Sequence, residues 1–391
     1  MLKSLFPRVT GKQGLTYNRL LLLIIASLIF IRPFICALAF PYLNFGFSFA
    51  LLFFLGLYLI HKKPLLPKAQ GLVYPFILFY LALCLSLFFS RDRFNSLMQL
   101  YQYLTGLGLL WTAASLPDDD RQRAANVMVL AGLIISLLAI HQYLFGFNHV
   151  LNYMSEHQIS LPFFLDYLQR KRAFFPFVTP GALGGYLAMV LFLVFNSKYS
   201  AGLGLLIFIA LVLTKSVNAF FCLWLGLVIY FALQNRLKRA NFLLLSGLLF
   251  AVLAVLAARS ATEKSYLHPT FSAAMRLSYW QGAWEIIKAH PLVGVGLGNF
   301  NLANSRYAHN AYLQLWAETG VIGLFSLLWM VGVIFKTGLK KLADLSGQKL
   351  TACLLAACVF FLLHNVLDFT FFLPEISLLW WVVLGLIVAG G

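Results

Sequence analysis

The sequence predicts an all-α membrane protein that crosses the bilayer about twelve times. Of its 391 residues, 61% are hydrophobic and 10% are charged, and the mean hydropathy is +0.86. A helix needs about 20 apolar residues to cross the hydrocarbon core, and the chain supplies many such runs. These values exclude an ordinary soluble domain. We see no internal repeat and no low-complexity tract, so residues 1–391 are expected to form a single integral membrane domain.

Twelve apolar segments support this prediction. Lys215 and Asn218 separate two of them, which makes the region from 201 to 233 the least regular. An even number of spans puts both ends of the chain on the same side of the membrane. The segments cover residues 20–41, 44–60, 71–90, 95–115, 124–143, 176–195, 201–214, 218–233, 241–258, 312–335, 350–369 and 375–391.

The distribution of basic residues predicts the orientation. The N-terminal tail and the short connections between alternate spans hold 17 of the 29 Lys and Arg residues, and segments rich in these residues stay on the inner side of a membrane. Both termini are therefore expected inside. The same rule, together with binding to anionic membrane lipid, accounts for the net charge of +17, so no nucleic-acid partner is expected. The inner basic residues are Lys3, Arg8, Lys12, Arg19, Lys62, Lys63, Lys68, Arg121, Arg123, Lys198, Arg236, Lys238, Arg239, Lys336, Lys340, Lys341 and Lys349.

Two long connections fall on the outer side, at residues 144–175 and 259–312. Connections of this length in a compact membrane protein usually carry function. In the second, Met275–His290 places Arg276 and several apolar residues on one face of a helix, which predicts an amphipathic helix at the membrane interface. Arg276 either anchors this helix among the headgroups or uses its planar guanidinium to bind a phosphate.

Polar residues then recur where the tenth span begins. Asn310, Gln314 and Glu318 follow one another at intervals of four, so a polar stripe enters the bilayer along one side of the helix. Polar residues at that depth are costly and usually face a cavity or a partner helix, so we expect them to bind substrate. His309 stands beside the stripe at the helix N-terminus. The helix dipole disfavours a protonated ring there, which leaves the imidazole available as a base.

Further cations are candidates for binding an anion on the outer side. Arg170, Lys171 and Arg172 precede the sixth span, where they bind either lipid headgroups or a substrate phosphate. Arg306 lies in the long second connection. Arg32, beside Pro33 in the first span, is either a buried substrate contact or an arginine that reaches the interface.

Other residue patterns exclude several kinds of site. Gly294, Gly296 and Gly298 alternate without the spacing of a dinucleotide fingerprint, so close packing of the backbone is the favoured interpretation. The outer carboxylates are scattered and show no ligand spacing, so neither a metal nor any other cofactor is expected. The five cysteines lie in apolar runs and suggest no disulfide framework.

The pattern R…W…HPLVGVGLGNF…HNAYLQLWAETGVIGL, from Arg276 to Leu324, resembles the signature of the O-antigen ligase and O-antigen polymerase superfamily of bacterial inner membranes. A weaker resemblance covers Arg172–Leu187, where the family often shows a proline-asparagine step and this chain has Pro180-Gly181. The twelve-span layout with a partly helical periplasmic loop between spans nine and ten also fits. The resemblance implies a multi-pass protein of the inner membrane with its active site facing the periplasm and both termini in the cytoplasm.

The resemblance also implies a reaction. Members transfer a glycan from an undecaprenyl-diphosphate carrier to an acceptor, which is lipid A–core for a ligase and another lipid-linked repeat for a polymerase. His309 corresponds to the family's essential histidine, and Arg172 and Arg276 to arginines associated with the diphosphate. We therefore expect a metal-independent, inverting O-antigen ligase-like glycosyltransferase. A polymerase of the same superfamily is the alternative, and a flippase for lipid-linked oligosaccharides is the alternative from another class.

Overall fold

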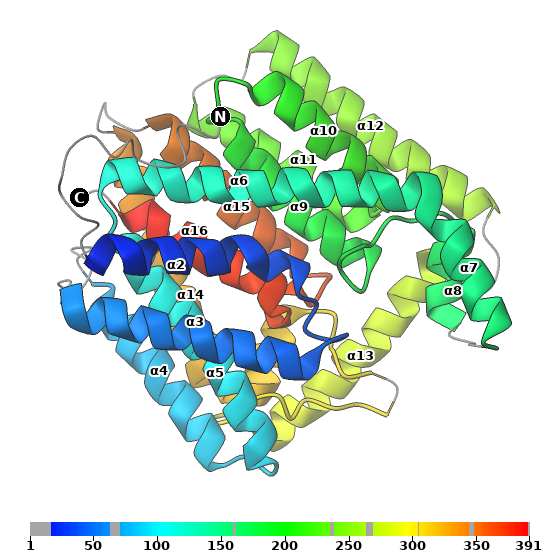
Figure 1. The fold of residues 1–391 in the computed structure, drawn as a ribbon. Helices are drawn as coiled ribbons and strands as arrows, with labels where there is room; N and C mark the ends of the chain where they lie inside the picture. Colours follow the sequence, from blue (N-terminus) through cyan, green and yellow to red (C-terminus); the bar gives the residue numbers. More distant parts are fainter. Residues whose placement is uncertain are drawn as a thin grey trace.

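The computed structural model describes residues 17–62, 71–158, 162–234, 238–262, 269–303, 305–343 and 348–389. The described residues form helices joined by turns and short irregular segments, and these residues contain no strand of a β-sheet. The prediction of an all-α fold is confirmed. Figure 1 shows the long helices side by side in a bundle.

Each of the twelve apolar segments contains a helix. Among the described residues, three helical segments are long and apolar enough to cross a membrane, namely Pro41–Lys62, Asp118–Glu156 and Ala311–Ala343, so the chain is a multi-pass membrane protein. The count of twelve spans stays a prediction. The helices are α2 (Tyr17–Ile31), α3 (Pro41–Lys62), α4 (Val73–Phe88), α5 (Arg93–Ala114), α6 (Asp118–His141), α9 (Pro180–Val194), α10 (Ser200–Thr214), α11 (Val217–Leu233), α12 (Arg239–Thr262), α14 (Ala311–Ala343), α15 (Gln348–His364) and α16 (Pro374–Val388).

The remaining α-helices of the described residues lie in the two long connections. A π-helical turn, Gln142–Gly146, joins α6 to α7 (Phe147–Glu156), and α8 (Pro162–Gln169) follows in the same connection. The second connection contains the helix α13 (Pro269–Ala289), which covers the expected Met275–His290 except for its last residue. Figure 1 shows α7, α8 and α13 away from the C terminus, and we call this part of the molecule the α13 end.

Two predicted spans are shorter than expected. The first helix ends at Ile31, and Arg32–Phe34 forms a 3₁₀ turn. Pro33 explains this end, because proline has no N–H to continue the helical hydrogen bonds. The eleventh helix ends at His364, so residues 365–369 form a connection instead of completing the span. That connection brings unexpected side chains to the candidate site.

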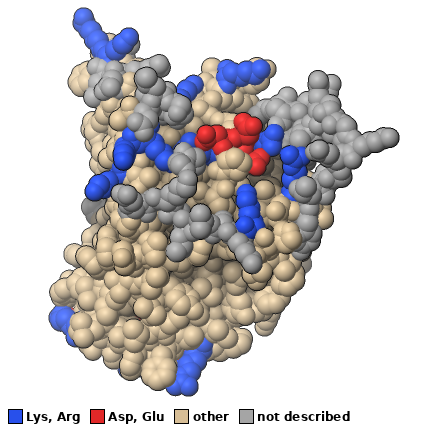
Figure 2. Space-filling model, turned by 90° about the vertical axis from the view of Figure 1, so that its left-hand side faces the viewer, with Lys and Arg blue, Asp and Glu red and all other residues tan. Residues whose placement is uncertain are grey.

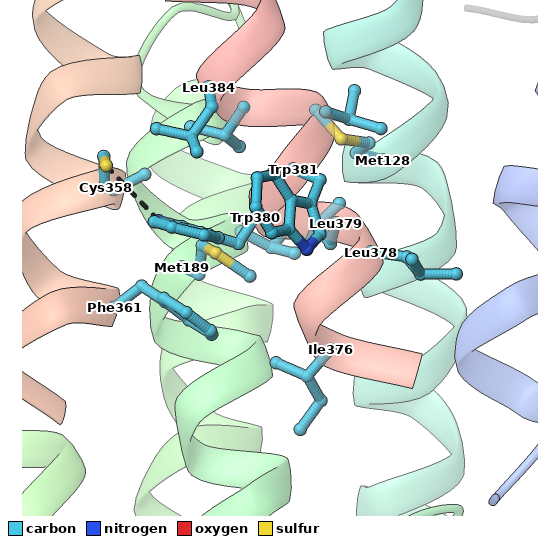
Figure 3. Close-up of a cluster of buried hydrophobic side chains, with 14 of the residues drawn as sticks. Met128, Met189, Cys358, Phe361, Ile376, Leu378, Leu379, Trp380, Trp381 and Leu384 are labelled. Atoms are coloured by element: carbon cyan, nitrogen blue, oxygen red, sulfur yellow. Dashed lines mark hydrogen bonds between the residues drawn. The ribbon is translucent and has the colours of Figure 1, made fainter. Parts of the chain in front are cut away.

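The core is organised around α16, in which every residue is buried. Trp380 and Trp381 project from it in Figure 3, and the indole N–H of Trp380 donates a hydrogen bond to the sulfur of Cys358 at 3.3 Å. α16 packs closely on α5 because small residues face it. A Cβ atom at Gly106 would lie 2.4 Å from the Trp381 ring, so glycine is required for this approach.

Candidate active site

His309 occupies a strained position immediately before α14. Its φ of 50° lies in the left-handed region, which costs a residue with a side chain roughly 1–2 kcal/mol. The next residue, Asn310, caps the helix: its Oδ1 accepts hydrogen bonds from the N–H groups of Tyr312 at 3.0 Å and Leu313 at 3.1 Å. Such strain persists only where the surroundings hold it, and it gathers at functional sites.

Aromatic rings hold the His309 imidazole. The Tyr279 ring of α13 stacks on it, with centroids 5.6 Å apart and an interplanar angle of 21°. The Phe369 ring meets it edge to face, at 4.8 Å and 83°. Burial among these groups lowers the pKa of His309, the nearby charge of Arg276 lowers it further, and Asp368 opposes both. A lowered pKa favours the neutral form of the ring at pH 7. The sequence predicted this outcome from the helix dipole, whereas the structure assigns the largest effect to burial.

Arg276 joins α13 to the connection between α15 and α16. Its Nε donates to the carbonyl oxygen of Leu367 at 3.2 Å, and its Nη1 donates to Ser272 Oγ at 2.7 Å. No carboxylate among the described residues lies within 4.0 Å of its guanidinium. The structure thus places Arg276, a predicted phosphate-binding residue, close enough to His309, the predicted base, for its charge to act on the imidazole.

The connection 365–369 was missed by the sequence analysis, which placed it inside a span. Its backbone is tied to the start of α14, because the N–H of Ala311 donates to the carbonyl oxygen of Asn365 at 2.9 Å. Asp368 lies 3.9 Å from the buried His364, measured from Oδ2 to Nε2. The stretch His364-Asn365-Val366-Leu367-Asp368 carried a signal, since three of its five residues are polar between two apolar runs.

The basic cluster contains Arg170, Lys171, Arg172 and Lys215, and Lys215 was not predicted as a site residue. Two segments far apart in sequence meet here: Arg172 Nε donates to the carbonyl oxygen of Thr214 at 3.3 Å, and Lys215 Nζ donates to that of Arg170 at 2.6 Å. Lys171 and Lys215 both have left-handed backbones, with φ of 49° and 51°. Burial and the charges of Arg172, Lys171 and Arg170 lower the pKa of Lys215, which shows how closely the four cations gather.

The N-terminal half of α9 connects this cluster to the His309 site. A Cβ atom at Gly184 would lie 3.2 Å from Ser216, beside Lys215, and a Cβ atom at Gly181 would lie 2.8 Å from Asp368 Oδ2. Gly181 is the residue at which the chain departs from the family's proline-asparagine step. Its close approach to Asp368 gives a physical reason for glycine at this position.

Gln314 and Glu318 form hydrogen bonds with each other and with backbone groups of the protein. Both are buried, and Gln314 Nε2 donates to Glu318 Oε1 at 3.0 Å. Glu318 Oε2 accepts from the N–H of Gly298 at 2.9 Å, and Gln314 Oε1 accepts from that of Ala308 at 3.1 Å. The polar stripe predicted from the sequence therefore packs against the Gly294–Ala308 connection, and it fixes the segment that leads to His309.

The glycines of this connection serve close packing, as the sequence indicated. Gly294 and Gly320 both have positive φ, and Gly320 interrupts the helical geometry of α14. A Cβ atom at Gly294 would lie 2.3 Å from the backbone of Glu318, and one at Gly320 would lie 1.9 Å from the carbonyl oxygen of Leu292. No residue with a side chain fits either position.

Two other residues predicted to contact substrate, Arg32 and Arg306, lie apart from the groups around His309 and from the basic cluster. Arg32 is buried in the core, with Nη2 3.6 Å from Glu375 Oε2, and it also donates to Asn44 Oδ1. Its charge already has a partner, so we give it a structural role. Arg306 is exposed, and the structure shows no hydrogen bond or ion pair for it among the described residues.

Residues 201–328 match the family model described as O-Antigen ligase. The predicted resemblance to the O-antigen ligase and polymerase superfamily is confirmed. The matched segment contains Lys215, Arg276 and His309. A comparison with curated proteins found no match. The family match supports a membrane enzyme of the O-antigen ligase or polymerase type, with lipid-linked glycans as the general substrate class.

Proposed function

We propose that the protein is an O-antigen ligase-like glycosyltransferase, which transfers a glycan from undecaprenyl diphosphate to lipid A–core. The single observation that carries this proposal is the half-buried imidazole of His309 near the charge of Arg276, inside the segment that matches the O-antigen ligase family. A neutral histidine next to an arginine suits a reaction that removes a proton from one substrate and releases an anion from the other.

His309 acts as the general base. The acceptor sugar hydroxyl attacks the anomeric carbon of the donor while His309 takes its proton, and a positioned base of this kind contributes about 10²–10⁴ in rate. The bond between the anomeric carbon and the phosphate oxygen breaks in the same step, and the lipid diphosphate leaves with the electron pair. A single displacement of this kind inverts the configuration at the anomeric carbon.

The basic cluster binds the diphosphate of the lipid-linked donor, and Arg276 stabilises that diphosphate as it departs. Arg276 lies beside His309, and Arg170, Lys171, Arg172 and Lys215 form the neighbouring basic cluster across α9. Fixed donors aimed at developing charge stabilise a transition state strongly, because they need not reorganise during the reaction. Guanidinium groups also bind phosphate oxygens in pairs. In this proposal the cations replace the divalent metal that many diphosphate-dependent transferases use.

The α13 end faces the periplasm in this proposal, and both termini lie in the cytoplasm of a bacterium whose inner membrane holds the protein. The charge distribution in the short connections supports this orientation. The grouping of the proposed site residues at one end also favours a transferase over a flippase, which needs cations reachable from both faces.

The proposal is tested by transfer in vitro, using purified protein in EDTA, an undecaprenyl-diphosphate glycan and either lipid A–core or a second lipid-linked glycan as acceptor. Transfer to lipid A–core with inverted anomeric configuration is the expected result. Lengthening of the lipid-linked glycan instead would identify a polymerase. Activity that disappears in EDTA and returns with Mg²⁺ would overturn the metal-independent mechanism, and a retained anomer would overturn the single displacement.

A further inference from the structure

We infer that Tyr279 and Phe369 are positioning residues, which clamp the His309 imidazole between two rings and so aim it at the acceptor hydroxyl. This inference rests on the proposed role of His309 as the base. It goes further by naming what orients that base, and it assigns a function to two residues that the sequence pattern did not single out.

The two rings restrain the imidazole in different directions. Tyr279 lies almost parallel to it, at 21°, and limits movement perpendicular to the ring plane. Phe369 stands almost perpendicular, at 83°, and limits rotation within the remaining space. Offset-stacked and edge-to-face pairs at these separations are the favoured aromatic geometries. Together they fix the plane of the imidazole ring.

Hydrogen bonds do not supply this orientation within the described part of the chain. A catalytic histidine is usually aimed by a hydrogen bond from one ring nitrogen to a carboxylate or a carbonyl oxygen. The described residues offer no such bond to either nitrogen of His309. Asp368, the carboxylate that acts electrostatically on His309, instead accepts from the N–H of Phe369 through Oδ1 at 2.7 Å and faces His364 through Oδ2.

The clamp is itself held firmly. The Phe369 ring stacks on Tyr307, with centroids 4.2 Å apart and an angle of 17°. Tyr279 belongs to α13, which the Arg276 bond to Leu367 ties to the same connection as Phe369. A small apolar cluster beneath α13, built on Ala283 and Ile287, packs this helix against the start of α14. Tyr279 and Phe369 therefore belong to elements that contact each other.

The clamp also makes the orientation of the His309 ring depend on how α13 and the 365–369 connection pack at the α13 end. The base is oriented only while α13 and the 365–369 connection are both docked on His309. The charged groups that act on His309 come from the same two elements, Arg276 from α13 and Asp368 from the connection. A shift of α13 or of the 365–369 connection therefore changes both the orientation of the His309 ring and the charges near it.

The test compares Tyr279→Phe and Tyr279→Leu in the full-length protein. Phe keeps the stacked ring, so its kcat should stay within about two-fold of wild type, whereas Leu should lower kcat by about 10-fold to 10²-fold with little change in KM, because misplaced reacting groups cost this much. In the Leu variant the imidazole is more exposed, so its pKa should rise toward the ordinary value of about 6.5 and the acid limb of the rate profile should move to higher pH.

Trp284→Leu is the matched control. Trp284 also lies on α13 and pairs with Trp316 of α14 at 5.7 Å, so its loss removes an aromatic contact between the same two regions without touching His309. We expect this variant to keep the wild-type pH profile. An equal fall in kcat for Trp284→Leu would mean that any loosening of α13 lowers the rate. This result would overturn a specific role for Tyr279 in holding His309.

Titration of His309 by NMR separates this inference from the proposed function. Ring ¹⁵N-labelled histidine, assigned with His309→Gln, reports the orientation and pKa of the imidazole without any substrate. A changed His309 titration in Tyr279→Leu and an unchanged one in Tyr279→Phe support the clamp even where no transfer is found. An unchanged titration in Tyr279→Leu overturns it, whatever the reaction proves to be.

Discussion

The end of the molecule shown in Figure 2 and the α13 end both carry cations, but the groups around those cations differ. Arg121 Nε donates to the carbonyl oxygen of Leu386 at 2.8 Å, and Lys341 Nζ donates to that of Val388 at 2.8 Å. These carbonyl groups belong to the last turn of α16, where no N–H group of the same helix follows to bond them. Cations near them therefore stabilise the end of the helix. An acidic group also lies among the cations in Figure 2, and Asp120 pairs with Arg123 at 2.7 Å.

The cations of the α13 end have a different environment. Lys171, Lys215 and Arg276 have no carboxylate within 4.0 Å among the described residues, and both lysines occupy strained left-handed positions. Like charges held together at a cost in backbone strain are poor stabilisers but suit an anionic ligand. A hydrogen bond to a carbonyl oxygen therefore does not by itself mark a structural cation, because Lys215 and Arg276 also make such bonds. The charges near each cation distinguish the two ends.

The largest effect is expected at His309. His309→Gly should lower kcat by about 10²–10⁴-fold, because the base is lost, yet it should unfold at the same or a higher temperature, because glycine relieves the left-handed strain. Transfer assays and thermal unfolding in detergent measure both, and added imidazole should restore part of the rate through the vacated space. His290→Ala, at the end of α13, serves as the control. Undiminished transfer by His309→Gly would remove this residue as the base.

Arg276→Lys should be the next most severe change. It keeps the positive charge but loses the planar fork that bonds Leu367 and Ser272, so the ammonium cannot hold the 365–369 connection and a phosphate oxygen together. We expect kcat to fall by about 10²-fold, as for removal of one donor that stabilises developing charge. Activity close to wild type would show that charge alone matters at this position and would reduce Arg276 to a general electrostatic role.

Local patterns in the sequence predicted the helices and two residues of the candidate site, Arg276 and His309. Helices and short motifs can be predicted in this way because they depend on residues that are neighbours along the chain. Apolar runs placed the spans, and one motif contained both Arg276 and His309. The 3.6-residue period also placed Gln314 and Glu318 correctly on one face of α14. It could not show that backbone N–H groups of the preceding connection lie opposite them.

Long-range packing explains what the sequence did not predict. Lys215 joins the basic cluster because the segment before α9 lies against the end of α10, and Phe369 reaches His309 because α15 stops at His364 inside an apolar run. Arg32 likewise finds its partner, Glu375, at the far end of the chain. No periodicity or spacing within one segment reports such contacts.

Lys215→Gly should have a smaller effect than the changes beside the reacting atoms. The KM for the lipid-diphosphate donor should rise about ten-fold, the size expected for one hydrogen bond to a charged group, while kcat changes little. Glycine suits a φ of 51°, so the variant should fold at least as well as wild type and the loss can be assigned to the ammonium. Lys288→Ala is the control, since Lys288 already pairs with Glu285 at 2.8 Å. Equal KM values for both variants would exclude Lys215 from the donor site.

Arg121→Met should leave transfer per folded molecule unchanged and should lower stability instead. Methionine matches the buried length of the side chain but removes the bonds to the Leu386 carbonyl oxygen and to Thr351 Oγ1, which leaves polar atoms buried without partners at a cost of about 1–3 kcal/mol. Thermal unfolding in detergent and the specific activity of the folded fraction measure the two quantities separately. If Arg121→Met lost activity at full stability, the cations at the α16 terminus would also serve the reaction. The distinction between the two ends would then fail, because a charge paired within the protein would have proved as functional as one left for a ligand.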